Sequence, residues 1–146
     1  MDASFAEAGL AGLFLLSLLA STILPLGSEW LLVLLLTQNV PPTACLLTAS
    51  VGNTLGALTL WWMGLYGWQW LRQRKTFDPG RQKQARRLYR RFGSWSLLLA
   101  WLPLVGDGLC LLAGAAGMDW RRFLVLVGTG KTLRYLFVTL VTLQLI

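Results

Sequence analysis

The sequence predicts an all-α integral membrane protein built from two related halves. First, 55% of its 146 residues are apolar, against ~45–50% in soluble domains. Second, Glu29 is the only charged residue between Ala8 and Leu71. Third, the pattern LPLGSE at residues 24–29 returns as LPLVGD at residues 102–107, 78 residues later. Each copy places a proline four residues before a carboxylate within apolar sequence.

A second motif supports the internal repeat at the same offset. The pattern GNTLG at residues 52–56 aligns with GKTLR at residues 130–134. We therefore expect one membrane domain over residues 1–146. It would comprise a first repeat at 9–70, a basic linker at 71–92 and a second repeat at 93–146.

Each repeat begins with an apolar segment that is interrupted by proline and glycine. Pro25 and Gly27 interrupt residues 9–36, and Pro103 and Gly106 interrupt residues 93–117. Proline removes a helical hydrogen bond and clashes with the preceding turn, so each segment should form two half-helices. In the second segment the arms Gly93–Leu102 and Asp107–Ala116 have ten residues each and reach ~15 Å, half of a ~30 Å hydrocarbon core. Both segments are predicted to be re-entrant, the first by symmetry with the second, and transmembrane helices should follow at 44–70 and 123–146.

The first arm leaves an alternative open, because its 16 residues from Gly9 to Leu24 are nearly long enough to cross a membrane alone. The second segment is better constrained. If residues 93–117 crossed the bilayer, Arg121 and Arg122 would lie opposite the basic linker, against the positive-inside rule. A segment that dips in and returns avoids this conflict. By symmetry the first segment would enter from the outside, and the halves would be inverted.

The basic linker holds most of the positive charge. Residues 72–91 contain nine Lys or Arg and one Asp, a net +8, whereas the whole chain carries +7. Such a segment beside membrane spans is predicted to be cytoplasmic and to contact anionic headgroups. Apolar residues at i, i+3, i+4 and i+7 over residues 85–92 indicate an amphipathic surface helix. Because the charge is confined to this segment, nucleic acid is not expected as a partner.

Four charges lie in the apolar segments, and an uncompensated charge at mid-membrane costs at least ~2.5–3.5 kcal/mol. Glu29 and Asp107 are candidates for transport and proton binding. Lys131 and Arg134 are candidates for substrate binding or ion pairing, and a guanidinium suits two-point contact with phosphate. The bland alternative is that all four only pair with each other or cap helices.

The first repeat has neutral residues where the second has Lys131. Asn53 and Thr54 could supply hydrogen bonds at this level, although helix packing explains them equally well. The chain has no histidine, no Gly-x-Ser-x-Gly elbow, no phosphate-binding glycine loop and no metal-ligand cluster. We therefore predict no enzyme activity, no metal and no cofactor.

Several motifs resemble the DedA family, the SNARE-associated or VTT-domain membrane proteins, and in particular its short YqaA-type branch. They are LPLGSE with Glu29, SVGNTLG at 50–56, WLPLVGDGLCLLAG at 101–114 with Asp107, and GKTLRY at 130–135. The resemblance implies two re-entrant segments from opposite faces, a bacterial inner-membrane location and a role in envelope maintenance. Longer members carry a glycine-arginine motif where this chain has Gly106 and Asp107, so an acid replaces a base.

Together these features predict an inner-membrane transporter. The resemblance implies a flippase or scramblase for undecaprenyl phosphate or phospholipid, and a small-solute translocator with optional proton coupling is also open. The expected partners are membrane lipids, a lipid-phosphate substrate and protons, and homo-oligomerisation stays open. The alternatives are a small multidrug-type proton-coupled exporter and a non-transporting structural or assembly factor.

Overall fold

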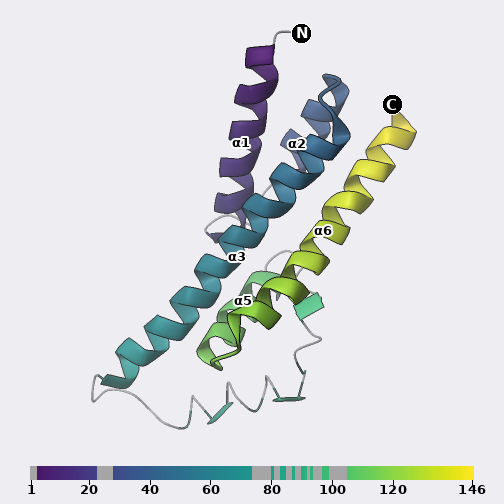
Figure 1. Cartoon of the computed structure of the whole chain (residues 1–146). Helices are drawn as coiled ribbons and strands as arrows, with labels where there is room; N and C mark the ends of the chain where they lie inside the picture. The colour runs from purple at the N-terminus through teal and green to yellow at the C-terminus, as the bar shows by residue number, and fades with distance from the viewer. Residues whose placement is uncertain are drawn as a thin grey trace.

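The computed structural model describes residues 3–22, 28–73 and 105–146, and nine positions between the last two ranges (80, 83, 84, 87, 90, 91, 93, 97 and 98). In these ranges the chain forms helices and no strand (Figure 1). The helices are α1 (Ala3–Thr22), α2 (Ser28–Thr37), α3 (Pro42–Gln73), α5 (Val105–Ala115) and α6 (Trp120–Leu145). By length and composition α1, α3 and α6 could each cross a membrane. The predicted all-α membrane fold is confirmed.

The helices agree with most of the segments expected from the sequence. The spans predicted at 44–70 and 123–146 correspond to α3 and α6, and α2 and α5 are short apolar helices after the two predicted breaks. The first helix starts at Ala3 rather than at residue 9, because alanine and glutamate are strong helix formers and extend the helix toward the N-terminus. Pro25, Gly27, Pro103 and most of the predicted amphipathic helix lie outside the described residues.

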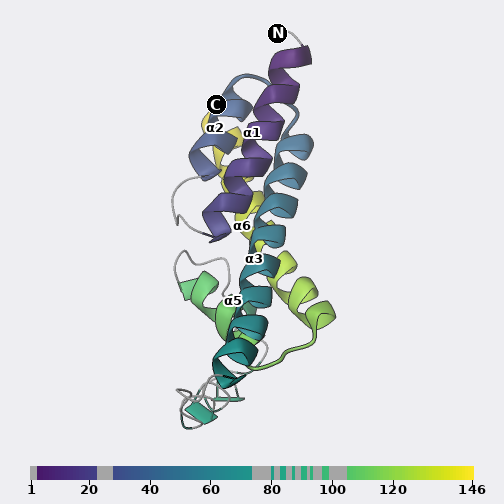
Figure 2. The same ribbon diagram turned by 90° about the vertical axis from the view of Figure 1, so that its left-hand side faces the viewer.

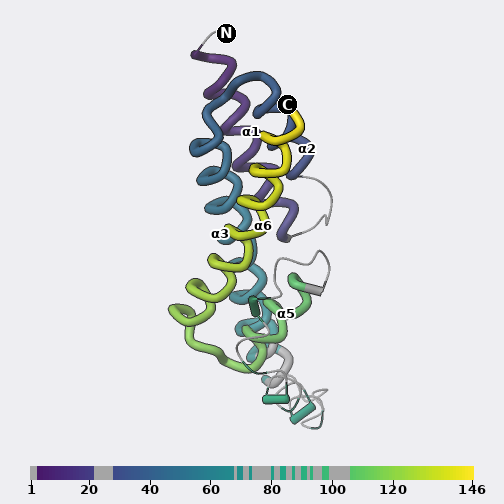
Figure 3. Tube along the Cα trace, turned by 90° about the vertical axis from the view of Figure 1, so that its right-hand side faces the viewer, coloured from purple at the N-terminus to yellow at the C-terminus, as the bar shows by residue number. Residues whose placement is uncertain are grey.

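Helix α3 is the central element, and it contacts each of α1, α2, α5 and α6. It runs along most of the molecule, and α6 crosses it in the opposite direction (Figure 1). Helices α1 and α2 lie in the half that holds both chain ends, whereas α5 lies in the other half (Figure 2). The end of α1 and the starts of α2 and α5 all lie near the middle of the molecule's length (Figure 3). The two short helices thus begin on either side of this middle level and extend away from it, beside two long helices.

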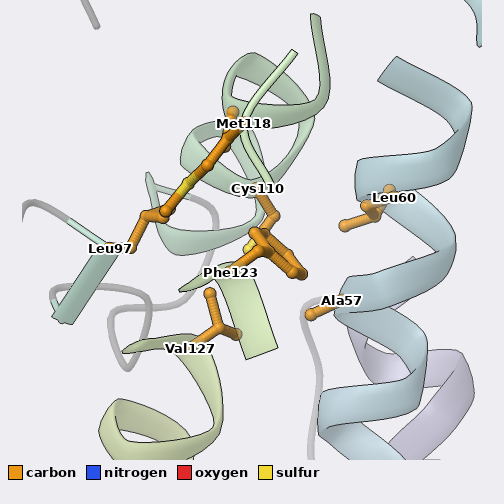
Figure 4. Close-up of a cluster of buried hydrophobic side chains, with 8 residues drawn as sticks. Ala57, Leu60, Leu97, Cys110, Met118, Phe123 and Val127 are labelled. Atoms are coloured by element: carbon orange, nitrogen blue, oxygen red, sulfur yellow. The ribbon is translucent and has the colours of Figure 1, made fainter. Parts of the chain in front are cut away.

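Two apolar clusters fill the two halves. The outer cluster, on the side of the chain ends, consists of Leu13, Leu32, Leu35, Leu36, Val40, Cys45, Ala49 and Tyr135. The inner cluster, on the side of α5, consists of Ala57, Leu60, Leu97, Cys110, Ala113, Met118, Phe123 and Val127 (Figure 4). Both cysteines are free and buried within these clusters, as expected for small apolar side chains.

The 78-residue offset of the sequence motifs recurs in the helix boundaries and in the clusters. Helix α2 ends at Thr37 and α5 at Ala115, and α3 begins at Pro42 and α6 at Trp120. Five residues of the inner cluster also correspond at this offset to residues of the outer cluster. These pairs are Cys110 with Leu32, Ala113 with Leu35, Met118 with Val40, Phe123 with Cys45, and Val127 with Ala49.

Glycines on α3 and α6 let neighbouring backbones approach. A Cβ on Gly52 would lie 2.7 Å from the Phe14 carbonyl oxygen of α1. A Cβ on Gly130, the equivalent position on α6, would lie 2.8 Å from the Leu98 carbonyl oxygen. The expected role of small residues in close helix packing is confirmed at Gly52. In both halves the long helix therefore packs through this glycine against chain that precedes the predicted break.

Candidate functional site: a charged centre between two apolar clusters

The polar residues of the long helices lie between the two clusters. On α3, Asn53 lies one turn from Ala49 of the outer cluster and one turn from Ala57 of the inner cluster. On α6, Lys131 lies in the same way between Val127 and Tyr135. Residues four apart share one helix face, so both polar residues belong to the buried stripe of their helix. The result is a polar layer, called the charged centre below, across the middle of the bundle.

Lys131 connects several residues of this centre, and its side chain is only 3% exposed. Its Nζ donates hydrogen bonds to Asn53 Oδ1 and, at 2.9 Å, to Ser21 Oγ. It also forms an ion pair with Asp107, with Nζ 3.6 Å from Oδ1. Ser21 Oγ in turn donates to Asp107 Oδ1 at 3.4 Å. The three donors of the ammonium thus face three oxygen partners from α1, α3 and α5, which compensates its burial.

Tyr135 extends the network to α2. Asn53 Nδ2 donates to the Tyr135 hydroxyl at 2.6 Å, and this hydroxyl lies 2.5 Å from Ser28 Oγ. Because the Tyr135 oxygen accepts from Asn53, its own hydrogen is free to be donated to Ser28. Through Ser21, Ser28, Asn53 and Asp107, the α6 residues are connected to all four other described helices.

A second ion pair lies beside the first, between Arg134 of α6 and Glu29 of α2. Arg134 is more exposed than Lys131: its side chain is 21% exposed, and that of its partner Glu29 is 27% exposed. Glu29 lies in the first turn of α2, and Asp107 lies in the first turn of α5. Both carboxylates thereby also stabilise the positive end of a helix dipole. Each short helix contributes one acid to a base on α6.

In the part of the chain that the structure describes, two buried hydroxyls have no partner. Ser17 Oγ on α1 and Ser50 Oγ on α3 form no hydrogen bond. They lie about one turn before Ser21 and Asn53, on the side of the outer cluster. Buried polar groups are usually satisfied, so these two hydroxyls are exceptions within the packed bundle. They extend the polar layer toward the chain ends.

The structure brings most of the predicted site residues together. Glu29, Asp107, Lys131, Arg134 and Asn53 all lie in the charged centre. Thr54 does not join it, because its methyl group faces α6, where a Cβ on Gly128 would lie 3.7 Å away. The buried Gly106 lies in the first turn of α5, directly before Asp107.

Sequence reasoning missed the serine of α1 and the connecting role of Tyr135. Ser21 carried a weak signal, since Ser17 and Ser21 are four residues apart and face the glycines Gly52 and Gly56 of α3. Tyr135 is likewise one turn beyond Lys131. Among the described residues, no three His, Cys, Asp or Glu side chains form a metal-binding group.

Comparison with known proteins gives consistent matches over nearly the whole chain. The VTT domain matches residues 3–144. The chain is 40% identical over 136 residues to the inner membrane protein YqaA of Escherichia coli K12, covering 92% of each chain, and equally similar to that of Shigella flexneri. A protein of Haemophilus influenzae is 35% identical over 136 residues, covering 84% of this chain and 80% of its own. No solved structure matches the chain.

Proposed function

Since the chain belongs to the VTT-domain (DedA) family of membrane proteins and lies in the inner membrane, we propose that it translocates a lipid with a phosphate headgroup. The charged centre would be the site where the headgroup binds during its passage. Arg134 would hold the phosphate, and Lys131 with its partners would fix the geometry around it. The similarity to VTT-domain proteins supports the family and the membrane location. The roles given to Arg134 and Lys131 are inferred from the geometry of this chain alone.

The observation that carries the proposal is the open ion pair of Arg134 and Glu29 between apolar helices. Both side chains are partly exposed, so an incoming anion can reach the guanidinium. The planar guanidinium offers a phosphate two parallel N–H donors, as it does a carboxylate. Exchange of Glu29 for a phosphate would keep Arg134 neutralised inside the bilayer, where an unpaired charge is costly.

The repeated architecture supports a translocation mechanism. We infer that the two halves are inverted repeats, each with a re-entrant pair of arms followed by a spanning helix. The shared helix boundaries and the corresponding clusters favour this interpretation. The antiparallel course of α3 and α6 favours it as well. Inverted repeats with broken helices that meet at mid-membrane are a recurrent transporter design, and the halves can rock about a fixed central site.

Proton coupling follows as an extension of the same exchange. A phosphate on Arg134 would leave Glu29 unpaired at the start of α2. A proton taken up by Glu29 would remove that charge, and release of the phosphate would restore the ion pair. Glu29→Gln would imitate the protonated form permanently, because the amide keeps the shape but cannot titrate.

The central test is lipid transfer in proteoliposomes that contain the full-length protein. Fluorescently labelled phosphatidylglycerol and a labelled undecaprenyl phosphate analogue would serve as probes, with a membrane-impermeant reductant reporting the fraction in the outer leaflet. The protein should accelerate transfer of at least one probe, and Arg134→Ala and Glu29→Gln should abolish the acceleration. Glu7→Gln, which removes an exposed carboxylate outside the centre, should leave it unchanged. Absence of transfer of both probes by folded protein would refute the proposal.

A non-transporting assembly factor is the second candidate, because every charge of the centre is already paired within the chain. It is distinguished by the double variant Arg134→Leu/Glu29→Leu, which removes the pair as a unit. An assembly factor would tolerate this change, whereas the proposed translocator would lose lipid transfer.

The inverted repeat has its own test in the accessibility of single cysteines. In a background with Cys45→Ala and Cys110→Ala, we expect a cysteine at Asn39 to react from outside and one at Asp119 from the cytoplasm. These positions lie in the turns before α3 and α6. Labelling of both from one side would contradict the inverted arrangement.

A further inference from the structure

An apolar cleft lies apart from the charged centre, in the half of the molecule that holds α5. Its volume is about 340 Å3. It is lined by Leu58, Thr59, Trp61 and Trp62 of α3 and by Trp120 at the start of α6. We propose that this tryptophan cleft binds one anionic phospholipid, with an acyl chain in the cleft and the phosphate at Arg121.

The wall of the cleft suits hydrocarbon. Two of its polar side chains already donate within the protein, since Thr59 Oγ1 donates to the Leu55 carbonyl at 3.1 Å and Trp61 Nε1 donates to the Met118 carbonyl at 3.1 Å. These two donors are therefore not available to a ligand in the cleft. Tryptophan rings favour the membrane interface, where acyl chains begin and headgroups end. An acyl chain matches this mostly apolar wall.

The mouth of the cleft carries positive charge. The guanidinium carbon of Arg121 lies 5.4 Å from the centroid of the Trp120 ring. This cation–π contact holds a phosphate-binding group beside the apolar wall. Arg121, Arg122 and Asp119 are all exposed here, which leaves a net charge of +1 in the turn. An anionic headgroup gains from this charge, whereas a zwitterionic one gains little.

The tryptophan cleft shares no residue with the charged centre. The bound phospholipid would therefore be a resident molecule rather than the transported one. If the protein does not transfer lipid in proteoliposomes, the proposed lipid site in the cleft is unaffected. If the purified protein does not retain a phospholipid, the proposed transport function is unaffected.

The test is native mass spectrometry of the purified full-length protein in detergent, titrated with phosphatidylglycerol or phosphatidylethanolamine. We expect one phosphatidylglycerol to be retained per chain, in preference to phosphatidylethanolamine. Arg121→Gln should lower the apparent affinity for phosphatidylglycerol about fivefold, the effect of one basic residue near an anionic lipid surface. Arg122→Gln removes the same charge two residues from Trp120, roughly 200° around the helix. This matched control should change the affinity by less than about twofold.

A second pair of variants tests the wall. Trp120→Ala should abolish retention of both lipids, whereas Trp120→Phe should keep the retention of phosphatidylglycerol. Thermal unfolding of each variant would show that the fold persists. Equal losses in Arg121→Gln and Arg122→Gln, equal retention of the two lipids by the natural protein, or full retention by folded Trp120→Ala would each overturn the proposal.

Discussion

The two ion pairs of α6 lie one turn apart but have different surroundings. Lys131 is buried and meets Asp107, Asn53 and Ser21 together. Arg134 is partly exposed, and Glu29 is the partner to which its guanidinium donates. A buried charge that loses a partner has no solvent to replace it, whereas a partly exposed charge can exchange partners. The comparison therefore favours a structural role for Lys131, and it supports the proposal that Arg134 binds the phosphate.

Truncation of Lys131 should give the largest effect on stability. Lys131→Ala leaves Asp107 without its cation and Asn53 Oδ1 without a donor. We expect a loss of about 3 kcal/mol, the lower end for a broken buried ion pair because Asp107 is 28% exposed. Arg134→Ala should cost less than this, because both members of that pair are partly exposed and no further hydrogen bond to Asn53 or Ser21 is lost. Thermal unfolding in a mild detergent measures both, and equal costs would contradict the division of roles.

Tyr135→Phe tests how far the buried network extends. Removal of the hydroxyl leaves Asn53 Nδ2 and Ser28 Oγ without this partner, which should destabilise the protein by about 1–3 kcal/mol. Tyr66→Phe is the matched control, since Tyr66 is exposed on α3 and packs edge to face against Trp62. An equal loss of stability in Tyr66→Phe would contradict a stabilising role of the buried Tyr135 hydroxyl.

Arg134→Lys separates charge from shape at the open pair. The ammonium keeps the charge but lacks the planar two-point contact with phosphate. We expect lipid transfer to fall about tenfold, which corresponds to ~1.4 kcal/mol, while the unfolding temperature stays nearly unchanged. Natural transfer rates in this variant would indicate that Arg134 only neutralises Glu29.

The smallest effect is expected at Thr54, the predicted site residue that lies outside the network. Thr54→Val keeps the shape of the side chain and removes its hydroxyl. Unfolding temperature and lipid transfer should both stay close to the natural values, within about 0.5 kcal/mol for stability. A loss of transfer in this variant would place Thr54 in the functional site after all.

Much of this fold was predictable because apolar length and proline breaks are local properties of the sequence. The spans α3 and α6, the short helices after the breaks and the family were all inferred correctly from residues. The charged residues of the centre were also identifiable, since a charge in an apolar helix is conspicuous. The extension of α1 to Ala3 was missed because the charge of Glu7 ends the uncharged run, although glutamate and alanine both favour a helix.

The partners within the centre could not be read from the sequence. Which acid meets which base depends on the rotation of α2 and α5 against α6, and neither helix has a local signal for its rotation. Ser21 was overlooked for a related reason, because serine is common in apolar helices and acquires meaning only when Lys131 faces it. Thr54 was grouped with Asn53 in the prediction but lies outside the hydrogen-bond network, because adjacent residues of a helix point about 100° apart.

The contact between Asn53 and Lys131 has an evolutionary consequence under the proposed inverted repeat. The two residues hold equivalent positions and touch each other. In a dimer of two identical chains, such a position on the two-fold axis would meet its own copy. Two lysines would then place two ammonium groups in contact, and two asparagines would supply no charge. Gene duplication and fusion removes this constraint, because each copy can then mutate alone, and a single central cation can arise that identical subunits cannot hold.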